Sequence, residues 1–282
     1  MNYIPSDRSK IVLLGTGNPN ADPARSGPAL AVLVDGTPYL VDCGPGIVRR
    51  AAAAFHNGIN GLDVIRLNNL FITHLHSDHT AGLPDLILTP WVLGRRKALH
   101  VYGPRGVNTL CEHLLLAYHE DIQQRIKGLE PANTTGWVVE SHEVIPGRVY
   151  QDEQVRVEAY PVSHGTWAAF SYKFTTPDST IAISGDRLPT ADAVSFFTGC
   201  DILIHEVYSS TAFERLPPDW QRYHSSVHTS SIELARLAGQ VKPELLVLTH
   251  QLLWGVSEEE LLGEIKDLYP GEVISGRDLD VF

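Results

Sequence analysis

The chain has 282 residues, and its 22 Lys and Arg against 33 Asp and Glu give a formal net charge of −11. This charge argues against a surface built mainly to hold phosphate backbones, which needs clustered cations, although a local basic groove can exist within an acidic total. A hydrophobic content of 43% with 20% charged residues is typical of a globular protein and excludes a disordered chain. Histidine is frequent, with 13 copies.

The cysteines and the short apolar runs indicate a reducing cellular compartment. Cys43, Cys111 and Cys200 cannot all pair with one another and show no CxxC spacing, which favours a reducing compartment. The N-terminal segment is polar, and the apolar run over residues 11–15 is too short for a signal peptide. No run approaches the roughly 18 apolar residues of a membrane helix. We therefore expect a cytoplasmic protein with no membrane partner.

Short apolar segments punctuated by Gly, Asp and Pro recur along the chain and predict strands. In chain order, the expected strands cover residues 11–14, 30–34, 39–41, 70–73, 155–162, 168–175, 180–184, 201–207 and 245–249. The expected helices cover residues 47–55, 107–126, 231–238 and 258–268. Ser230 and Glu233 match a capping box for the third helix, and Pro270 with Gly271 ends the fourth. Strands in both halves with helices between them predict an α/β (α+β layered) fold of sheets covered by helices.

The strongest chemical signal lies directly after the expected strand 70–73. His74, His76, Asp78 and His79 crowd into six residues there, and a tight loop at a strand end can turn His74 and His76 to the same side. Imidazole nitrogens and carboxylate oxygens are the ligands of zinc and other borderline divalent ions. A solvated polar loop is the alternative, but apolar strands rarely end in such a density of donors.

Three further donors follow expected strands in the same way. His164 follows strand 155–162, Asp186 follows strand 180–184, and His250 follows strand 245–249. Taken singly, each is better explained as a residue with satisfied hydrogen bonds. Together with the first loop they supply five His and two Asp, which is enough for two metal ions with open coordination positions.

The order of these donors resembles the metallo-β-lactamase superfamily through nearly the whole chain. Further segments resemble its ribonuclease Z and arylsulfatase-like branch: residues 14–17 (LGTG), 41–46 (VDCGPG), 205–208 (HEVY) and 228–230 (HTS). The resemblance implies an αββα sandwich forming a single metallo-hydrolase domain over residues 1–282, with a dinuclear site at one edge of the sheets. It also makes a homodimer plausible.

The same resemblance implies a role for each donor. It assigns one ion to His74, His76 and His164, the second ion to Asp78, His79 and His250, and a bridging position to Asp186. A water shared by two such ions becomes hydroxide near neutral pH and can attack phosphorus, sulfur or a carbonyl carbon. Zinc is the expected ion, with manganese or iron as alternatives, because a His/Asp site selects weakly.

Other residues are implied to act beside the metal ligands. His228, together with Asp78, is expected to be catalytic, and His228 resembles the residue that stabilises the developing anion or protonates the leaving group. The alternative for His228 is a cap on the helix that follows. Asp42 and Glu206 resemble carboxylates that accept hydrogen bonds from ligand imidazoles and so set their tautomers.

The number of residues between the third and fourth motifs helps to distinguish a tRNA substrate from a small molecule. Many ribonuclease Z chains carry a long Gly-rich basic arm between their third and fourth motifs, whereas here Asp186 lies only 22 positions after His164, with Lys173 the one basic residue between them. RNA recognition needs a cationic track or stacking platforms. We therefore expect a small-molecule substrate rather than tRNA, and a tRNA 3′-end endonuclease of the ribonuclease Z type is the alternative.

Aromatic residues and an insertion support that expectation. The extra length falls over residues 104–150, as an insertion expected to shape the substrate pocket, and Trp91, Trp137, Trp167 and Trp254 are candidates to line it. Each could equally fill the core or a dimer interface. The predicted function is a dinuclear metal-dependent hydrolase of a phosphoester, sulfate ester or lactone. A metal-depleted binding protein is disfavoured because the ligand set is complete.

Overall fold

The structure, a computed structural model, describes residues 8–282. Residues 1–7, which belong to the polar N-terminal segment considered above for a signal peptide, lie outside the described residues. The chain divides into two compact units. The N-terminal unit contains Lys10–Gly15, Ala21–Ile145 and Asp278–Phe282, and the C-terminal unit contains Thr16–Asn20 and Pro146–Arg277. The single domain with an insertion over residues 104–150 stays a prediction.

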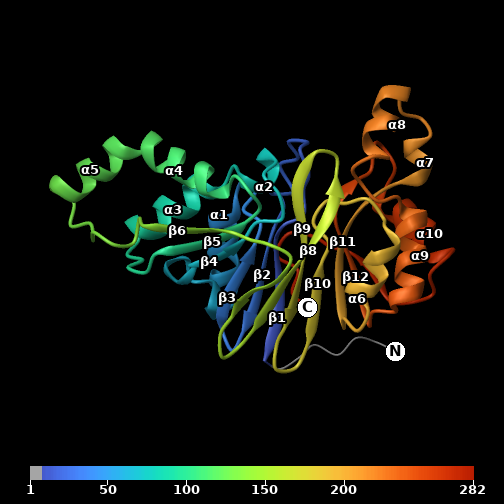
Figure 1. The fold of residues 1–282 in the computed structure, drawn as a ribbon, viewed down its shortest axis with the longest axis horizontal. Coiled ribbons are helices and arrows are strands. Elements are labelled where there is room, and N and C mark those ends of the chain that lie inside the picture. Colours follow the sequence, from blue (N-terminus) through green and yellow to red (C-terminus); the bar gives the residue numbers. More distant parts are fainter. Residues whose placement is uncertain (1–7) are drawn as a thin grey trace. The chain divides into compact units, whose positions relative to one another are not determined.

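The N-terminal unit contains a six-stranded sheet in the order β1-β2-β3-β4-β5-β6 (Figure 1). Its strands are β1 (Ser9–Gly15), β2 (Ala29–Val34), β3 (Thr37–Val41), β4 (Asn69–Phe71), β5 (Leu99–Gly103) and β6 (Val139–Glu143). β2 and β3 are antiparallel, whereas β3, β4, β5 and β6 run parallel. Parallel strands place their carboxyl ends at one edge of the sheet, and the loop with four predicted metal donors follows β4 at that edge.

The helices of the N-terminal unit are α1 (Ile47–His56), α2 (Ser77–Thr80), α3 (Leu83–Val92), α4 (Val107–Ala117) and α5 (His119–Lys127), with the 3₁₀ helices η1 (Asn60–Leu62) and η2 (Val64–Arg66). Those with apolar faces pack on the sheet. Ala51 of α1 and Leu86 of α3 share a fully buried core with Leu40 and Leu70 of the sheet. Burying one such aliphatic side chain contributes about 1.5–3 kcal/mol, so this core fixes the strand ends that carry the donors.

The prediction of one continuous helix over residues 107–126 is wrong, because two helices cover this segment. It breaks at Tyr118 (φ −99°, ψ 12°), which separates α4 from α5. The two helices have different surroundings, because Val107 and Cys111 of α4 are buried, whereas α5 is polar and buries only Ile122. A continuous helix would give both segments one direction, and the break lets each follow its own environment.

The C-terminal unit contains a seven-stranded sheet in the order β13-β12-β11-β10-β9-β8-β7. Its strands are β7 (Gly147–Gln151), β8 (Arg156–His164), β9 (Trp167–Thr175), β10 (Thr180–Ile183), β11 (Ile202–Tyr208), β12 (Leu245–Leu252) and β13 (Val273–Ser275). β7 to β10 form an antiparallel meander, and β10 to β13 are parallel. The predicted meander strands are confirmed, and β9 and β10 lie between His164 and Asp186.

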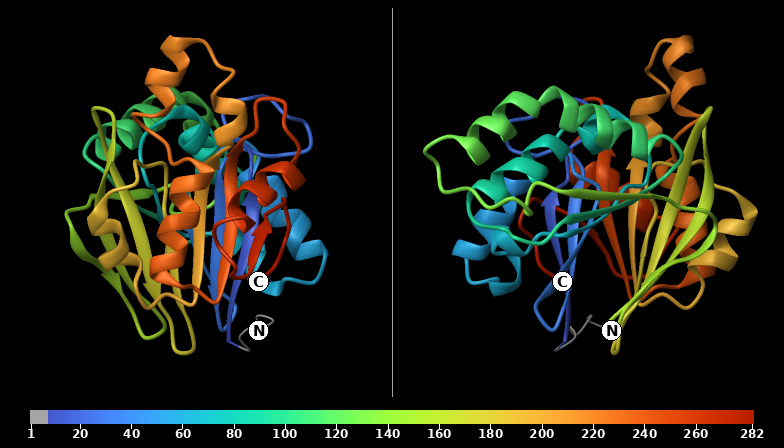
Figure 2. Two further views of the ribbon diagram at one scale, coloured as in Figure 1. Left: turned by 90° about the vertical axis from the view of Figure 1, so that its right-hand side faces the viewer. Right: turned by 60° about the vertical axis from the view of Figure 1, so that its left-hand side comes forward.

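The described part of the C-terminal unit also contains five helices. They are α6 (Ala191–Phe197), α7 (Ser210–Phe213), α8 (Pro218–His224), α9 (Ser231–Val241) and α10 (Glu258–Lys266). α6, α9 and α10 bury their apolar residues against β11 and β12, whereas α8 stands beyond the end of this sheet (Figures 1 and 2). The capping box of Ser230 and Glu233 is confirmed, and Ser257 with Glu260 forms a second one.

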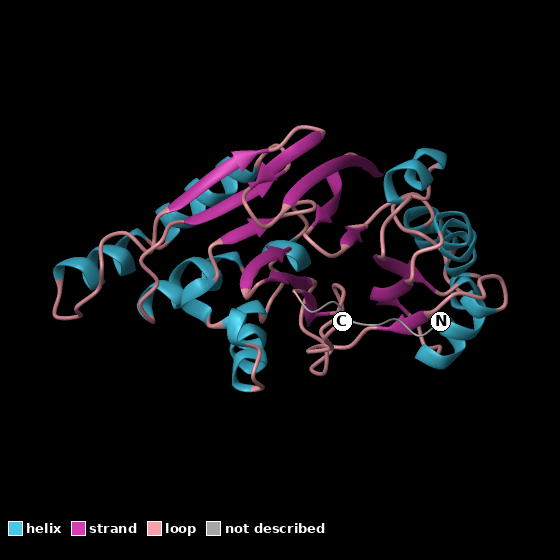
Figure 3. Cartoon of the chain, turned by 90° about the horizontal axis from the view of Figure 1, so that it is seen from below, coloured by secondary structure: helices cyan, strands magenta, loops and turns pink. Residues whose placement is uncertain are grey.

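The mixed α/β class, with two sheets and covering helices, is confirmed (Figure 3). The pattern analysis missed the 3₁₀ helices η1 and η2 and the elements α2, α3, β5, β6, β7, α6, α7, α8 and β13. α3 contains Pro90, and the strands β5, β6, β7 and β13 have three to five residues, which is too short for a periodicity to stand out. Within residues 8–282, no helix is both long enough and apolar enough to cross a membrane.

Candidate metal centre

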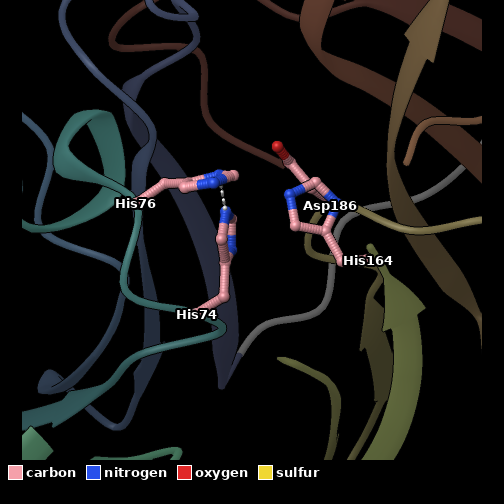
Figure 4. Close-up of side chains that lie close together, drawn as sticks. All are labelled: His74, His76, His164 and Asp186. Carbon is pink, nitrogen blue, oxygen red and sulfur yellow. Dashed lines mark hydrogen bonds between the residues drawn. The ribbon is translucent and has the colours of Figure 1, made fainter. Parts of the chain in front are cut away.

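In the N-terminal unit, the loop after β4 brings imidazoles together. Nε2 of His74 lies 3.0 Å from Nδ1 of His76, and Nδ1 of His74 lies 3.0 Å from the Thr73 hydroxyl (Figure 4). His74 is fully buried. Two nitrogens bound at 2.0–2.1 Å to one tetrahedral ion would be about 3.4 Å apart, so the two rings are close to the spacing that one ion requires.

Asp42 organises this loop from the end of β3. Its carboxylate accepts a hydrogen bond from the Thr73 backbone N–H (2.7 Å) and lies 2.8 Å from Nδ1 of His79. An imidazole that donates through Nδ1 presents the lone pair of Nε2 to a metal. Nε2 of His79 lies 3.5 Å from the Asp78 carboxylate. Asp42 therefore holds His79 in the tautomer that a metal ligand needs.

Gly44, in the segment 41–46, lets the turn after β3 pack against the donor loop. A Cβ at this position would lie 2.5 Å from the Asp78 carbonyl oxygen, which is far inside van der Waals contact. The Cys43 N–H donates to the His79 carbonyl at 2.8 Å. The turn and the donor loop are thus joined through backbone atoms at a distance that only glycine permits.

In the C-terminal unit, His164 ends β8 and Asp186 follows β10, and both are buried (Figure 4). Nδ1 of His164 lies 2.8 Å from the Val227 carbonyl and donates to it, which leaves Nε2 as the available lone pair. Burial lowers the pKa of His164, although Asp186 and the Val227 carbonyl act in the opposite direction. A neutral imidazole is the form that binds metal.

His250 owes its position to a β-bulge. Glu206 of β11 pairs with Thr249 and the next residue pairs with Gln251, so that His250 is the extra residue of β12. Its backbone is left-handed, with φ +46°, a conformation rare for side chains other than Gly, Asn and Asp. A bulge redirects one side chain out of the regular alternation, and Nε2 of His250 lies 3.4 Å from the Asp186 carboxylate.

His228 completes a buried cluster with Asp186 and His250. Nδ1 of His228 lies 3.3 Å from one Glu206 oxygen and 3.8 Å from Asp186. The other Glu206 oxygen accepts the Thr229 N–H at 2.8 Å, which holds this carboxylate in place. Glu206 therefore stands next to His228 in the position from which a carboxylate orients an imidazole.

The four predicted pocket tryptophans lie in different surroundings. Trp91 is buried in the N-terminal unit, where its indole N–H donates to the Asn133 carbonyl at 2.7 Å, and Trp137 is partly buried. Trp167 is 45% exposed at the start of β9. Trp254 lines a cavity of about 780 Å³ together with His228.

Three residues of that cavity were missed by the sequence reasoning: Trp220, Tyr223 and His224 of α8. Their spacing of i, i+3 and i+4 places them on one helix face, and this spacing is the signal that could have found them. Burial, followed by the neighbouring His228 and His250, lowers the pKa of His224 to about 4, so its ring is neutral at pH 7.

Comparison with known proteins identifies the family. Residues 37–251 match the Beta-lactamase superfamily domain. The ribonuclease Z of Mycobacterium sp. (strain KMS) is 32% identical over 275 residues, covering 96% of this chain and 94% of that protein. The ribonuclease Z of Mycobacterium bovis (strain BCG / Pasteur 1173P2) is 30% identical over 276 residues, covering 96% of each. The structure of human tRNase Z, short form, has a TM-score of 0.72 at 23% identity and covers 97% of this chain and 98% of its own.

The chain belongs to the metallo-β-lactamase superfamily and is a metal-dependent hydrolase. Within that superfamily it falls in the ribonuclease Z branch, and its fold is that of the superfamily. Both the sequence-based family assignment and the α/β fold class are therefore confirmed.

The predicted small-molecule substrate, and the expectation that tRNA is not a partner, are wrong, because the full-length relatives are ribonuclease Z enzymes. The argument from net charge failed because −11 is a sum over the whole chain, whereas phosphate contacts depend on local cations. The short segment between His164 and Asp186 excludes an arm at that place only, and an RNA can be held elsewhere on the surface.

Proposed function

We propose that this protein is a tRNA 3′-end endonuclease of the ribonuclease Z type, which hydrolyses a phosphodiester at the 3′ trailer of precursor tRNA. The observation that carries the proposal is the identity of 30–32% to ribonuclease Z over 96% of this chain and at least 94% of the relatives. A match of this extent spans all the candidate donors from His74 to His250 rather than one shared motif.

We propose two divalent ions, with zinc as the first candidate. His74, His76 and His164 would hold one, Asp78, His79 and His250 the other, and Asp186 would be shared. The donor chemistry fits, because Asp42 and the Val227 carbonyl orient His79 and His164 with Nε2 as the lone pair. When bound, such ions polarise a phosphoryl oxygen and lower the pKa of water.

The remaining chemistry belongs to side chains of this protein. His228, beside Glu206 and Asp186, can carry a proton on one ring nitrogen while the other faces the substrate. An imidazolium in this place stabilises negative charge on a phosphate oxygen or donates a proton to the leaving oxygen.

The test is cleavage of a precursor tRNA with a defined 3′ trailer by the metal-loaded protein. We expect one cut at the trailer junction and loss of activity after chelation, restored by zinc, manganese or iron(II). Intact precursor after incubation with protein that contains two equivalents of metal would contradict the proposed function. Less than half an equivalent of metal, with no loss on chelation, would contradict the metal-dependent mechanism.

Metal counting needs a control, because His100, Glu140 and His142 form another group of donors on β5 and β6. Glu140 and His142 are exposed, and Nδ1 of His100 lies 3.3 Å from the Glu140 carboxylate. Excess zinc can bind such a surface group. The variant His142→Ala should therefore lose any third equivalent of zinc and keep the two that support cleavage.

A cytoplasmic location and a homodimer also belong to the proposal. All three cysteines are buried and unpaired, which suits a reducing compartment. Fractionation of the source cells tests the location, and light scattering during size exclusion tests the dimer: a mass near twice 31.1 kDa is expected, and a mass of one chain would contradict the dimer.

A further inference from the structure

A cavity of about 780 Å³ in the C-terminal unit is lined by ten residues, five of which carry aromatic rings. Trp220 and Tyr223 come from α8, and Trp254 comes from the turn after β12. Trp220 is 55% exposed and Tyr223 is 42% exposed, so α8 presents large apolar surfaces at the open side of the cavity. The volume lies in the range of about 300–1,000 Å³ that holds small organic groups.

A column of rings connects this cavity to the donor cluster. Trp220 stacks near His224 (5.6 Å between ring centroids, 23° between planes), and His224 stacks near His228 (5.6 Å, 30°). His228 in turn stacks near His250 (5.5 Å, 27°). Since His228 both lines the cavity and touches the Asp186 cluster, an occupant of the cavity lies next to the reacting group.

The polar groups of the lining suit a nucleobase. Asp219 is the acidic residue of the lining, and the guanidinium of Arg222 lies 3.4 Å from it. Asn20 supplies an amide, held by Asn18, whose own amide donates to the Gln251 carbonyl at 2.8 Å. The Asp219 carboxylate and the Asn20 amide can form hydrogen bonds with the amino and imino groups of a base.

We propose that this aromatic cavity binds an unpaired nucleobase of a nucleotide next to the scissile phosphate, by stacking on Trp220 and Trp254. The proposal rests on the proposed function and adds a binding subsite to it. Single-stranded RNA is recognised by stacking unpaired bases on aromatic side chains. The ring column places that base beside His228, so stacking would position the phosphate for cleavage.

The first test is cleavage of precursor tRNA by Trp220→Ala and Trp220→Phe. Loss of one stacked base lowers kcat/KM about 5- to 150-fold, and the aromatic replacement should restore most of it. Leu268→Ala is the matched control, because Leu268 is 52% exposed in the same unit and does not line the cavity. Metal content and melting temperature should equal wild type in all three variants.

A substrate series decides whether the lost contact is with a base. Precursors that lack the base on either side of the scissile phosphate are cleaved by wild type and by Trp220→Ala. At one of the two positions, base removal should slow wild type by the same factor as the substitution and leave no further effect of Trp220→Ala. Equal effects of Trp220→Ala on both abasic substrates and on the intact precursor would overturn the proposal while the proposed function stands.

Binding without turnover gives a separate readout. Adenosine 5′-monophosphate or uridine 5′-monophosphate should quench the indole fluorescence of wild type, and this quenching should be smaller in Trp220→Ala. Ribose 5-phosphate, which has no base, should cause none. Equal quenching by ribose 5-phosphate would show phosphate binding alone and would also overturn the proposal. If wild type leaves precursor tRNA intact but a nucleotide still quenches Trp220, the cavity binds bases and the proposed function is the part that fails.

Discussion

Single residues near the donors adopt backbone conformations that regular elements avoid. Asp42 has φ +57°, His250 has φ +46° and Trp254 has φ +43°. Left-handed conformations of residues other than glycine cost of order 1–3 kcal/mol and persist where the surroundings hold them. Here the Thr73 N–H holds the Asp42 side chain, and the bulge in β12 accommodates His250. These costs are concentrated where side chains must point in particular directions.

Asp186→Ala tests the shared ligand. Removing this carboxylate takes away the proposed bridge and the group that lies 3.4 Å from His250. We expect both metal content and cleavage of precursor tRNA to fall, with metal below half of the wild-type amount. Elemental analysis after dialysis checks this. Full metal content in the variant would refute the bridging role.

His228→Ala separates catalysis from metal binding. Because His228 is proposed to act on the substrate, its loss should leave metal content near wild type and reduce turnover at least about tenfold, within the range of general acid catalysis. Single-turnover kinetics and metal analysis of the same preparation measure both quantities. If metal is lost as well, the role assigned to His228 is wrong.

At the scale of elements, buried polar side chains tie segments together where apolar packing alone does not. Arg95 follows α3 and is 1% exposed. Its guanidinium donates to the carbonyls of Leu67, Leu86, Ile87 and Gly136 at 2.8–3.2 Å. Burial lowers its pKa to about 10, so it stays charged at neutral pH. One side chain thus connects η2, α3 and the loop before β6.

Arg95→Met removes these donors and leaves the carbonyls buried. An unsatisfied buried polar group costs about 1–3 kcal/mol, so we expect the free energy of unfolding to fall by at least about 2 kcal/mol. Urea unfolding measures this change. Arg96→Met is the matched control, because Arg96 is the exposed neighbour, and a similar loss in both variants would contradict the assigned role of Arg95.

Glu264 of α10 joins three helices of the C-terminal unit. Its carboxylate accepts from the Ser209 hydroxyl and the Ser210 N–H at the start of α7, and from the Ser231 hydroxyl at the start of α9. Partial burial would raise the pKa of Glu264, but these hydrogen bonds outweigh it, so the pKa is lowered from 4.5. The carboxylate form therefore stabilises the arrangement of the helix ends.

A lowered folded-state pKa predicts the pH dependence of Glu264→Gln. The stabilisation is fully present above the unfolded pKa, near 4.5, and disappears as the pH falls through the lower folded-state pKa. We expect the variant to melt below wild type at pH 7 and the difference to shrink below pH 4.5. Thermal melts across pH 3–8 test this, and a difference independent of pH would contradict it.

At the scale of the whole molecule, the net charge of −11 must be reconciled with the proposed polyanionic substrate. A protein can hold RNA through a local set of Lys and Arg whatever its total charge. Binding of this kind releases counterions and weakens with salt. If the substrate is precursor tRNA, its KM should therefore depend on salt, whereas the KM of a neutral small molecule should not.

For precursor tRNA, KM should rise at least about tenfold between 50 and 200 mM KCl, as expected for about three or more phosphate contacts. The value of kcat should change little, because the contacts act in binding. Initial rates across this range of salt measure both, and melting curves in the same buffers exclude an effect on the fold. A KM independent of salt would argue that backbone phosphates are not held by cations.

The sequence by itself determined the family, the α/β class and the identity and order of the candidate donors. Ligand chemistry belongs to the side-chain type, and His74, Asp186 and His250 each follow an apolar run that is legible as a strand. It did not determine the substrate, because the net charge is a sum over the whole chain and the spacing of two motifs excludes an RNA-binding arm at one place only.

Only the tertiary structure decided which ring nitrogen of each histidine donor is available to a metal. His164 is oriented by the carbonyl of Val227, which lies 63 residues away, and His79 by Asp42, which lies 37 residues away. The bulge at His250 exists only because β12 pairs with β11. The positions of the histidines and aspartates after expected strands predicted a metal site. The tautomer of each imidazole, the direction of each side chain and the aromatic cavity depend on contacts between distant segments, which no local pattern contains.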